Sequence, residues 1–198
     1  MKSEERREQS VFATAEGKKK LLKALQYYDA IAGRTPRETL SVEDPQALAV
    51  ANVIEQLGRG VPHPYILGRA LFMGNPFYCT KDTLIPRDET SLLVETACEF
   101  LEQKKKRGAD VQTLIEIGTG CGNIAVSLAM RCGGGVQILA SDISAAAVEV
   151  ARRNVRRYEV EGKVSLYCGD LYEPFRDHQG AVDMVVCNPP YIPTTSLK

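Results

Sequence analysis

The chain has few of the residues that metal centres and covalent catalysts need. Its 198 residues include only two histidines, His63 and His178, from which no Ser/His/Asp or Cys/His catalytic arrangement can be assembled. The six cysteines form no C-x-x-C pair, so their spacing predicts no metal site. Several stand on apolar strand or helix patterns and are predicted to be small buried hydrophobic residues in a reducing compartment. The six cysteines of the chain are Cys79, Cys98, Cys121, Cys132, Cys168 and Cys187.

The chain also lacks net charge, since 25 lysines and arginines balance 25 aspartates and glutamates. A protein that follows nucleic-acid phosphates needs an excess of positive charge, so direct nucleic-acid binding is not expected. Basic runs do occur at residues 18–20, 104–107 and 152–157. We interpret them mainly as solvated helix faces and favourable charges at helix C-termini, with RNA contact as the less favoured alternative.

No apolar run approaches the length of a membrane span, so no membrane association is expected. Residues 1–10 are highly charged without the apolar core of a secretory signal, and their acidic residues are untypical of a transit peptide. With 44% hydrophobic and 25% charged residues, the composition is typical of a soluble globular enzyme. These features together predict a cytoplasmic protein.

A glycine-rich turn stands between an expected strand and an expected helix. Residues 113–117 are an apolar run, and the apolar residues of 123–130 recur at helical spacing. Glycines let the backbone approach a ligand closely, and the helix start supplies free N–H groups and a positive dipole end. The spacing is G-x-G-x-G, with Asn123 where the dinucleotide fingerprint has its third glycine, which favours a ligand without a pyrophosphate. The residues predicted to bind this ligand are Glu116, Gly118, Thr119, Gly120, Cys121 and Gly122.

Two aspartates follow the next two expected strands. Residues 136–140 lead to Asp142, about 20 residues beyond the glycines, where a carboxylate accepts two ribose hydroxyls. Residues 164–168 lead to Asp170, which is placed to accept from an adenine amino group, and its neighbour Leu171 is included in the predicted site. Each aspartate alone has an equally good interpretation as a helix cap or turn residue. Their repetition after successive strands favours ligand binding.

The sequence Asn188-Pro189-Pro190-Tyr191 follows the apolar run 182–187, so it is expected where a buried strand opens into a loop. The Asn188 side-chain oxygen can accept one N–H of a substrate amide or amino group, and the Pro189 carbonyl can accept the other. The prolines fix φ and remove two donors, and the Tyr191 ring offers a surface for stacking. We predict catalytic roles for Asn188, Pro189 and Tyr191, substrate binding by all four residues, and a cofactor contact for Asn188. The alternative is an ordinary proline-rich strand exit.

The remaining patterns predict how the chain is organised. Helices are expected over residues 16–33, 45–58 and 90–107, and residues 62–86 are punctuated by glycine and proline in a way typical of a hairpin-like linker. Strands and helices then alternate, which predicts an α/β fold with an open parallel sheet. Ligands of such sheets gather at the carboxyl ends of the strands.

Taken together, these motifs resemble the class I S-adenosylmethionine-dependent methyltransferases, and more closely the HemK-type glutamine methyltransferases that modify peptide chain release factors. NPPY alone is shared with adenine-N6 methyltransferases of DNA and RNA, whereas the segment around Pro86 favours glutamine. Besides the glycine turn and Asp142, the resemblance rests on Pro64-Tyr65-Ile66-Leu67-Gly68, Thr83-Leu84-Ile85-Pro86-Arg87 with Glu89-Thr90, Asp170-Leu171-Tyr172-Glu173-Pro174 and NPPY.

The resemblance implies a reaction, a cofactor and a partner. A methyl group would pass from S-adenosylmethionine to the side-chain amide nitrogen, N5, of the glutamine in a Gly-Gly-Gln motif. The substrate would be a peptide chain release factor, and the complete enzyme is expected to be a monomer. In this interpretation Glu116 lies near the methionine end of the cofactor.

The resemblance also implies domain boundaries. Residues 1–60 are expected to form a helical domain that binds the substrate protein, 61–88 a linker or hairpin, and 89–198 a Rossmann-like methyltransferase domain. The family's sheet has seven strands in the order 3-2-1-4-5-7-6, of which about four are visible here. The chain is therefore expected to be truncated at its C-terminus, with residues 182–187 forming an exposed apolar edge that favours self-association.

Two alternatives from other classes stay open. One is an adenine-N6 methyltransferase of RNA or DNA, which the neutral charge and the residues around Arg87 disfavour. The other is an inactive fragment that only binds the cofactor.

Overall fold

The computed structural model describes residues 14–19, 22, 26, 45–108, 113–132 and 135–189, and its contacts divide the chain into the units Met1–Ile66 and Leu67–Lys198. Helix α3, Pro45–Gly58, begins at a proline and ends at a glycine, as predicted. Of the first expected helix, residues 16–19, 22 and 26 are helical. Its other members, including Leu21, Leu25 and Tyr28, lie outside the described residues.

The expected hairpin is present and has a helical turn ahead of it. Strands β1, Arg69–Phe72, and β2, Asn75–Tyr78, pair antiparallel around Met73 and Gly74, both of which have positive φ. The short helix α4, His63–Leu67, was not predicted, because five residues show no helical period. It forms because the Pro62 carbonyl accepts from the Tyr65 and Ile66 N–H groups.

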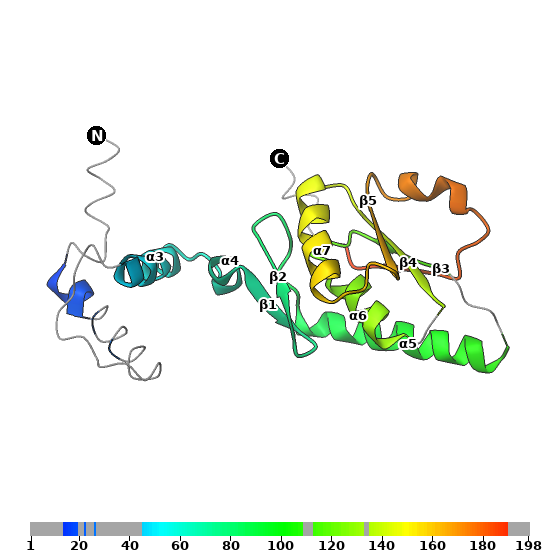
Figure 1. Cartoon of the computed structure of the whole chain (residues 1–198), viewed down its shortest axis with the longest axis horizontal. Coiled ribbons are helices and arrows are strands. Elements are labelled where there is room, and N and C mark those ends of the chain that lie inside the picture. The colour runs from blue at the N-terminus through cyan, green and yellow to red at the C-terminus, as the bar shows by residue number, and fades with distance from the viewer. Residues whose placement is uncertain are drawn as a thin grey trace, which may run out of the picture. The chain divides into compact units, whose positions relative to one another are not determined.

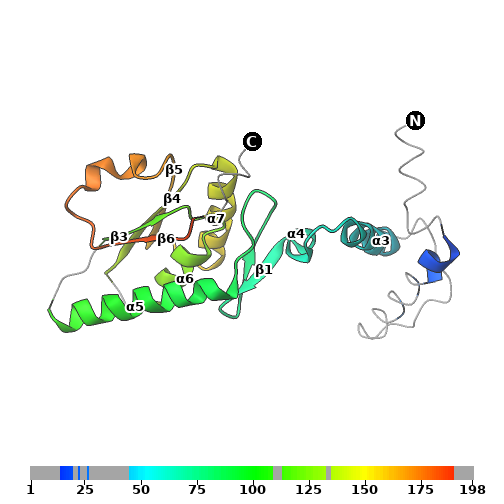
Figure 2. The same ribbon diagram turned by 180° about the vertical axis from the view of Figure 1, so that it is seen from behind.

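The second unit contains the predicted open sheet. Its four strands are parallel and lie in the order β5-β4-β3-β6 (Figures 1 and 2). Counted along the chain, this is the third, second, first and fourth strand of the sheet. This confirms the predicted α/β class, with about four strands in the described part. The elements are η2 Asp88–Thr90, α5 Ser91–Lys106, β3 Thr113–Ile117, α6 Asn123–Arg131, β4 Gln137–Asp142, α7 Ala145–Arg157, β5 Val164–Cys168, η3 Glu173–His178 and β6 Met184–Cys187.

The two faces of the sheet are covered differently. Leu114 of β3 packs in a large core with α5, α6 and α7, while Ile115 and Ile117 pack on the other face against Phe175 of η3. Figures 1 and 2 show α5, α6 and α7 grouped on one side of the sheet. By strand alternation, Glu116 lies on the Leu114 side, so the core of the domain contains a carboxyl group.

The strand β6 forms an edge of the described sheet. It begins two residues after the start of the apolar run. Asp183 bonds Thr113 through both its N–H and its side chain, and Val182 packs against the Ile115 and Ile117 cluster. In the described residues β6 pairs only with β3, and Val185 is 46% exposed. The predicted exposed apolar edge is therefore confirmed for this part of the chain.

Candidate active site

The three predicted pieces of the site meet at the carboxyl ends of neighbouring strands. Strand β3 lies between β4 and β6, and Ile117 at its end is in register with Ser141 on one side and Cys187 on the other. The glycine turn, Asp142 and Asn188 follow these strand ends. Such a switch point, where neighbouring connections leave in different directions, is where open α/β sheets bind ligands.

The glycine turn is packed on one side and open on another. Gly118, Gly120 and Gly122 have φ values of 73°, 54° and 79°, which glycine adopts without strain. A Cβ on Gly118 or Gly120 would meet nothing within 4 Å, whereas one on Gly122 would lie 3.1 Å from the Cβ of Ala151 in α7. The turn therefore needs Gly122 to pack against α7, while its other two glycines leave room for a ligand.

Glu116 holds the turn from inside the domain. Its side chain has no exposed surface, and Oε2 accepts from the Thr119 hydroxyl at 2.8 Å and the Ala125 N–H at 3.0 Å. The other oxygen, Oε1, is buried and has no hydrogen-bond partner among the described residues. Burial raises the pKa of Glu116 to about 7. A cationic group bound beside the turn would favour the ionised form of Glu116 through the low-dielectric interior, without contacting it.

The structure shows one of the two interpretations of Asp142 that the sequence left open, that of a turn residue. Its Oδ2 accepts from the Gly120 N–H and its Oδ1 from the Ser144 N–H, each at 2.9 Å. Ser144 in turn caps α7 by accepting from the Ala147 N–H. Asp142 is thus a turn residue that braces the glycine loop. Each carboxylate oxygen has further acceptor capacity, so ribose binding by Asp142 stays a compatible prediction.

The predicted adenine-end residues lie after β5 and are exposed. The Gly169 N–H donates to the Asp142 carbonyl, which brings the Asp170 segment to the carboxyl ends of the strands, where the site lies. Leu171 is 58% exposed with a φ of 44°, and its carbonyl accepts from the Ser141 hydroxyl at 3.5 Å. Their roles toward adenine stay predictions.

Cys121 contributes its backbone to the turn, since its side chain is 1% exposed. Its thiol donates to the Asn123 side chain at 3.5 Å, and burial raises its pKa to about 12.

On the other side of β3, Asn188 is half-buried and makes a contact that was not predicted. Its Nδ2 donates to the Thr90 hydroxyl at 3.2 Å, and Thr90 is the N-cap of α5. The available signal was the Glu89-Thr90 pair that carried part of the family resemblance. Pro189 is exposed, and Pro190 and Tyr191 lie outside the described residues.

Asn154 of α7 is a second residue that was not predicted. It is fully buried and bonds the Cys121 carbonyl and the backbone of Tyr78. No sequence signal identified it, because a single asparagine on a helix most often faces solvent.

Comparison with known proteins identifies the class of this domain. The family model "Methyltransferase small domain" matches residues 90–196, and the chain belongs to that family. The methyltransferase class that the motifs predicted is thereby confirmed, and the match supports S-adenosylmethionine as the cofactor. None of the helices in the described ranges combines the length and apolarity that a membrane crossing needs.

Curated relatives carry a more particular name. The release factor glutamine methyltransferase of Chlorobaculum tepidum is 41% identical over 137 residues, covering 68% of this chain and 46% of that protein. That of Bordetella pertussis is 42% identical over 133 residues, covering 67% and 46%. The chain spans about half the length of these relatives. Among solved structures, the human methyltransferase 10 domain containing protein has a TM-score of 0.48 at 17% identity, covering 78% of this chain and 65% of that one.

Proposed function

We propose that this chain carries the cofactor-binding and substrate-orienting parts of a methyltransferase that modifies the glutamine of the Gly-Gly-Gln motif in peptide chain release factors. The observation that carries the proposal is the Asn188–Thr90 hydrogen bond beside the glycine turn. It joins the NPPY motif to the segment that favours glutamine over a nucleic-acid base. The names of the curated relatives support the same substrate.

The glycine turn and Asp142 fit a nucleoside-bearing cofactor such as S-adenosylmethionine, whose sulfonium supplies an electrophilic methyl group. Gly118 and Gly120 leave open space beside the backbone, and the Asp142 carboxylate is already fixed by two N–H groups. The buried, unpartnered Oε1 of Glu116 favours positive charge at the methionine end. Asp170 and Leu171 would contact the adenine.

The substrate side of the site has to make a poor nucleophile react. The lone pair of an amide nitrogen is delocalised into its carbonyl, so orientation and electrostatics carry most of the catalysis. Because the Asn188 amide donates to Thr90, its oxygen is turned away from that contact and is left to accept a substrate N–H. The Pro189 carbonyl would accept the second N–H, and Tyr191 would stack on the amide plane. Both contacts stabilise the positive charge that develops on nitrogen during transfer.

The wider assignments follow from the same resemblance. Residues 1–60 would bind the release factor, 61–88 would connect the domains, and 89–198 would carry the chemistry. We propose a cytoplasmic enzyme that is a monomer when complete. An adenine-N6 methyltransferase is the second candidate, since NPPY is common to both classes, but the relatives' names do not favour it.

The test is methyl transfer from labelled S-adenosylmethionine to two kinds of acceptor. One is a release-factor domain containing Gly-Gly-Gln, with a Gly-Gly-Ala variant as its matched control, and the other is adenine-containing RNA and DNA. Label in the glutamine substrate alone supports the proposal. Label in nucleic acid would replace it with the second candidate, and cofactor binding without transfer to any acceptor would indicate a fragment that only binds.

A further inference from the structure

A buried amide joins the glycine turn to the β1–β2 hairpin. Asn154 lies on α7 with no exposed surface. Its Oδ1 accepts from the Tyr78 N–H at 2.8 Å, and its Nδ2 donates to the Tyr78 carbonyl at 3.0 Å and the Cys121 carbonyl at 2.8 Å. Both amide hydrogens are therefore used inside the protein, and they connect three segments that are distant in sequence.

Helix α7 contacts the turn at a second point, through Ala151. Residues three apart lie on one helix face, so Ala151 packs against Gly122 while Asn154 bonds the preceding carbonyl. On the opposite side of the turn, the Gly120 N–H bonds Asp142. The turn is thus fixed from two sides. On one side it is held by Asp142, the residue predicted to bind ribose, and on the other by Ala151 and Asn154, for which no cofactor contact is predicted.

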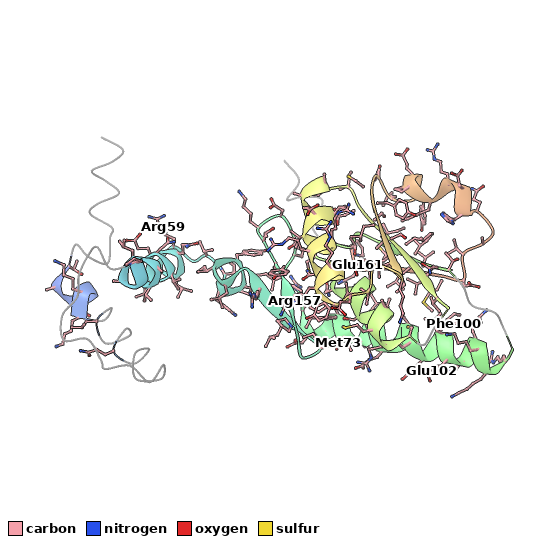
Figure 3. All side chains as sticks on the ribbon, viewed as in Figure 1. Arg59, Met73, Phe100, Glu102, Arg157 and Glu161 are labelled. Atoms are coloured by element: carbon pink, nitrogen blue, oxygen red, sulfur yellow. The ribbon has the colours of Figure 1, made fainter. Side chains whose placement is uncertain are left out.

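The hairpin is held to α7 by further contacts. The Tyr158 hydroxyl donates to the Pro76 carbonyl at 2.8 Å, and the Tyr158 ring lies 5.0 Å from that of Phe77. Figure 3 labels Met73 at the tip of the hairpin and Arg157 at the end of α7. These contacts make the hairpin and α7 one support for the turn, so displacement of the hairpin is transmitted through Asn154.

We propose that Asn154 is a positioning residue that sets the glycine turn for cofactor binding and couples it to the hairpin. The proposal rests on the proposed function, because it takes the turn to be the S-adenosylmethionine site. Having no exposed surface, Asn154 acts through the Cys121 carbonyl and not by touching the cofactor. The hairpin, expected from the sequence to be a linker, becomes part of the scaffold of the cofactor site.

An asparagine is required because one side chain must accept once and donate twice. Asn154→Asp is nearly isosteric and keeps the acceptor for the Tyr78 N–H. It places a carboxylate oxygen against the carbonyls of Tyr78 and Cys121, so both donated bonds are lost. This variant therefore removes the hydrogen-bond donors with little change in volume.

The experiment compares the 198-residue chain with Asn154→Asp and with Val155→Ala, a stability control. Val155 is the next residue on α7, is 3% exposed and packs in the main core. Two quantities are measured: calorimetric affinity for S-adenosylmethionine, and the alkylation rate of the Cys121 thiol, followed by peptide mass spectrometry. Because Cys121 is 1% exposed, its alkylation requires the turn to open.

We expect Asn154→Asp to weaken cofactor binding by roughly 10-fold or more and to accelerate Cys121 alkylation by a similar factor. Val155→Ala should lower the thermal midpoint while leaving both quantities close to wild type. Equal effects of the two variants, or no effect of Asn154→Asp, would overturn the proposal. If wild type binds no cofactor, the proposed function fails, and the alkylation comparison still decides whether Asn154 positions the turn.

A measurement on the unaltered chain covers the case in which Asn154→Asp does not fold. Hydrogen exchange of the Tyr78 amide, which donates to Asn154, should slow when S-adenosylmethionine is added. The neighbouring Cys79 amide bonds the Gly68 carbonyl instead and should change less. Equal behaviour of the two amides would contradict coupling through Asn154.

Discussion

The two flanks of strand β3 are built in different ways. On the β4 side, Asp142 is held by two backbone N–H groups, and β4 also pairs with β5 on its other side. On the β6 side, the described residues show the Asn188 side chain donating a hydrogen bond to Thr90, and the strand ahead of it is an edge of the described sheet. The proposed cofactor half of the site is thus held by two partly buried backbone hydrogen bonds and by a strand that is paired on both sides. The substrate half depends on a strand exit with much less support.

The largest effect that separates these halves is expected at Asn188. Asn188→Ala should lower methyl transfer at least ~100-fold, the scale of losing one preorganised polar contact, while cofactor affinity stays within about threefold. Single-turnover transfer and calorimetry measure the two quantities on the chain extended by downstream strands of a relative. Thr90→Val, which removes only the hydroxyl that orients Asn188, should give a smaller loss of the same kind. Parallel losses of binding and rate would assign Asn188 to the cofactor half.

On the cofactor side, Asp142→Ala should weaken S-adenosylmethionine binding by roughly 2–3 kcal/mol, because charge-assisted bonds to ribose are lost. The Gly120 and Ser144 N–H groups lose their acceptor in the same variant, so the turn also loosens. Asp177→Ala removes an exposed carboxylate of η3 and is the charge-matched control. Unchanged calorimetric affinity of Asp142→Ala would remove this residue from the site.

Two glycine substitutions distinguish the packed side of the turn from its open side. Gly122→Ala places a Cβ 3.1 Å from Ala151 at a positive φ and should destabilise the fold by about 1–3 kcal/mol. Gly120→Ala has the backbone strain without a close neighbour, so its stability loss should be smaller. Its added methyl points into the open space and should weaken cofactor binding more than that stability loss explains. Chemical denaturation measures the stability of both variants, and calorimetry measures their cofactor affinity. A larger stability loss for Gly120→Ala than for Gly122→Ala would mean that the open side of the turn was wrongly identified.

A pH dependence of the stability is expected at Glu116. Because burial raises its folded-state pKa from 4.5 to about 7, the folded protein binds this proton more tightly than the unfolded chain. The resulting stability is fully present below about pH 4.5 and is lost as the pH rises through about 7. Glu116→Gln cannot titrate, so its stability should change less over this window. The free energy of unfolding of both proteins is measured by denaturation at several pH values. If it changed with pH by the same amount in both, the account would be contradicted.

The sequence predicted the sheet because its strands are short, mostly apolar runs that are followed by glycine, aspartate or asparagine. Residues 113–117 and 164–168 match β3 and β5 at both ends. The five-residue helix α4 was not predicted, since it depends on the Pro62 carbonyl and has no period of its own.

Within the site, the motif residues were predictable because their spacing relative to strand ends is a local property. The contacts that Thr90 and Asn154 make were not, because they join residues that lie 98 and 76 positions apart in the sequence. Such pairings are set by how the elements pack, and no pattern within one segment encodes them. The roles predicted for Pro190 and Tyr191 stay predictions, because these residues lie outside the described part of the chain.

The central claim is that the cofactor half of this site serves transfer to a glutamine side chain. It is tested most directly by mass-spectrometric mapping of the methyl group after incubating the extended chain with S-adenosylmethionine and a release-factor domain. We predict one methyl group on the side-chain nitrogen of the Gly-Gly-Gln glutamine, absent with the Gly-Gly-Ala substrate and with Asn188→Ala. Methylation at another residue, or equal methylation of both substrates, would contradict the account.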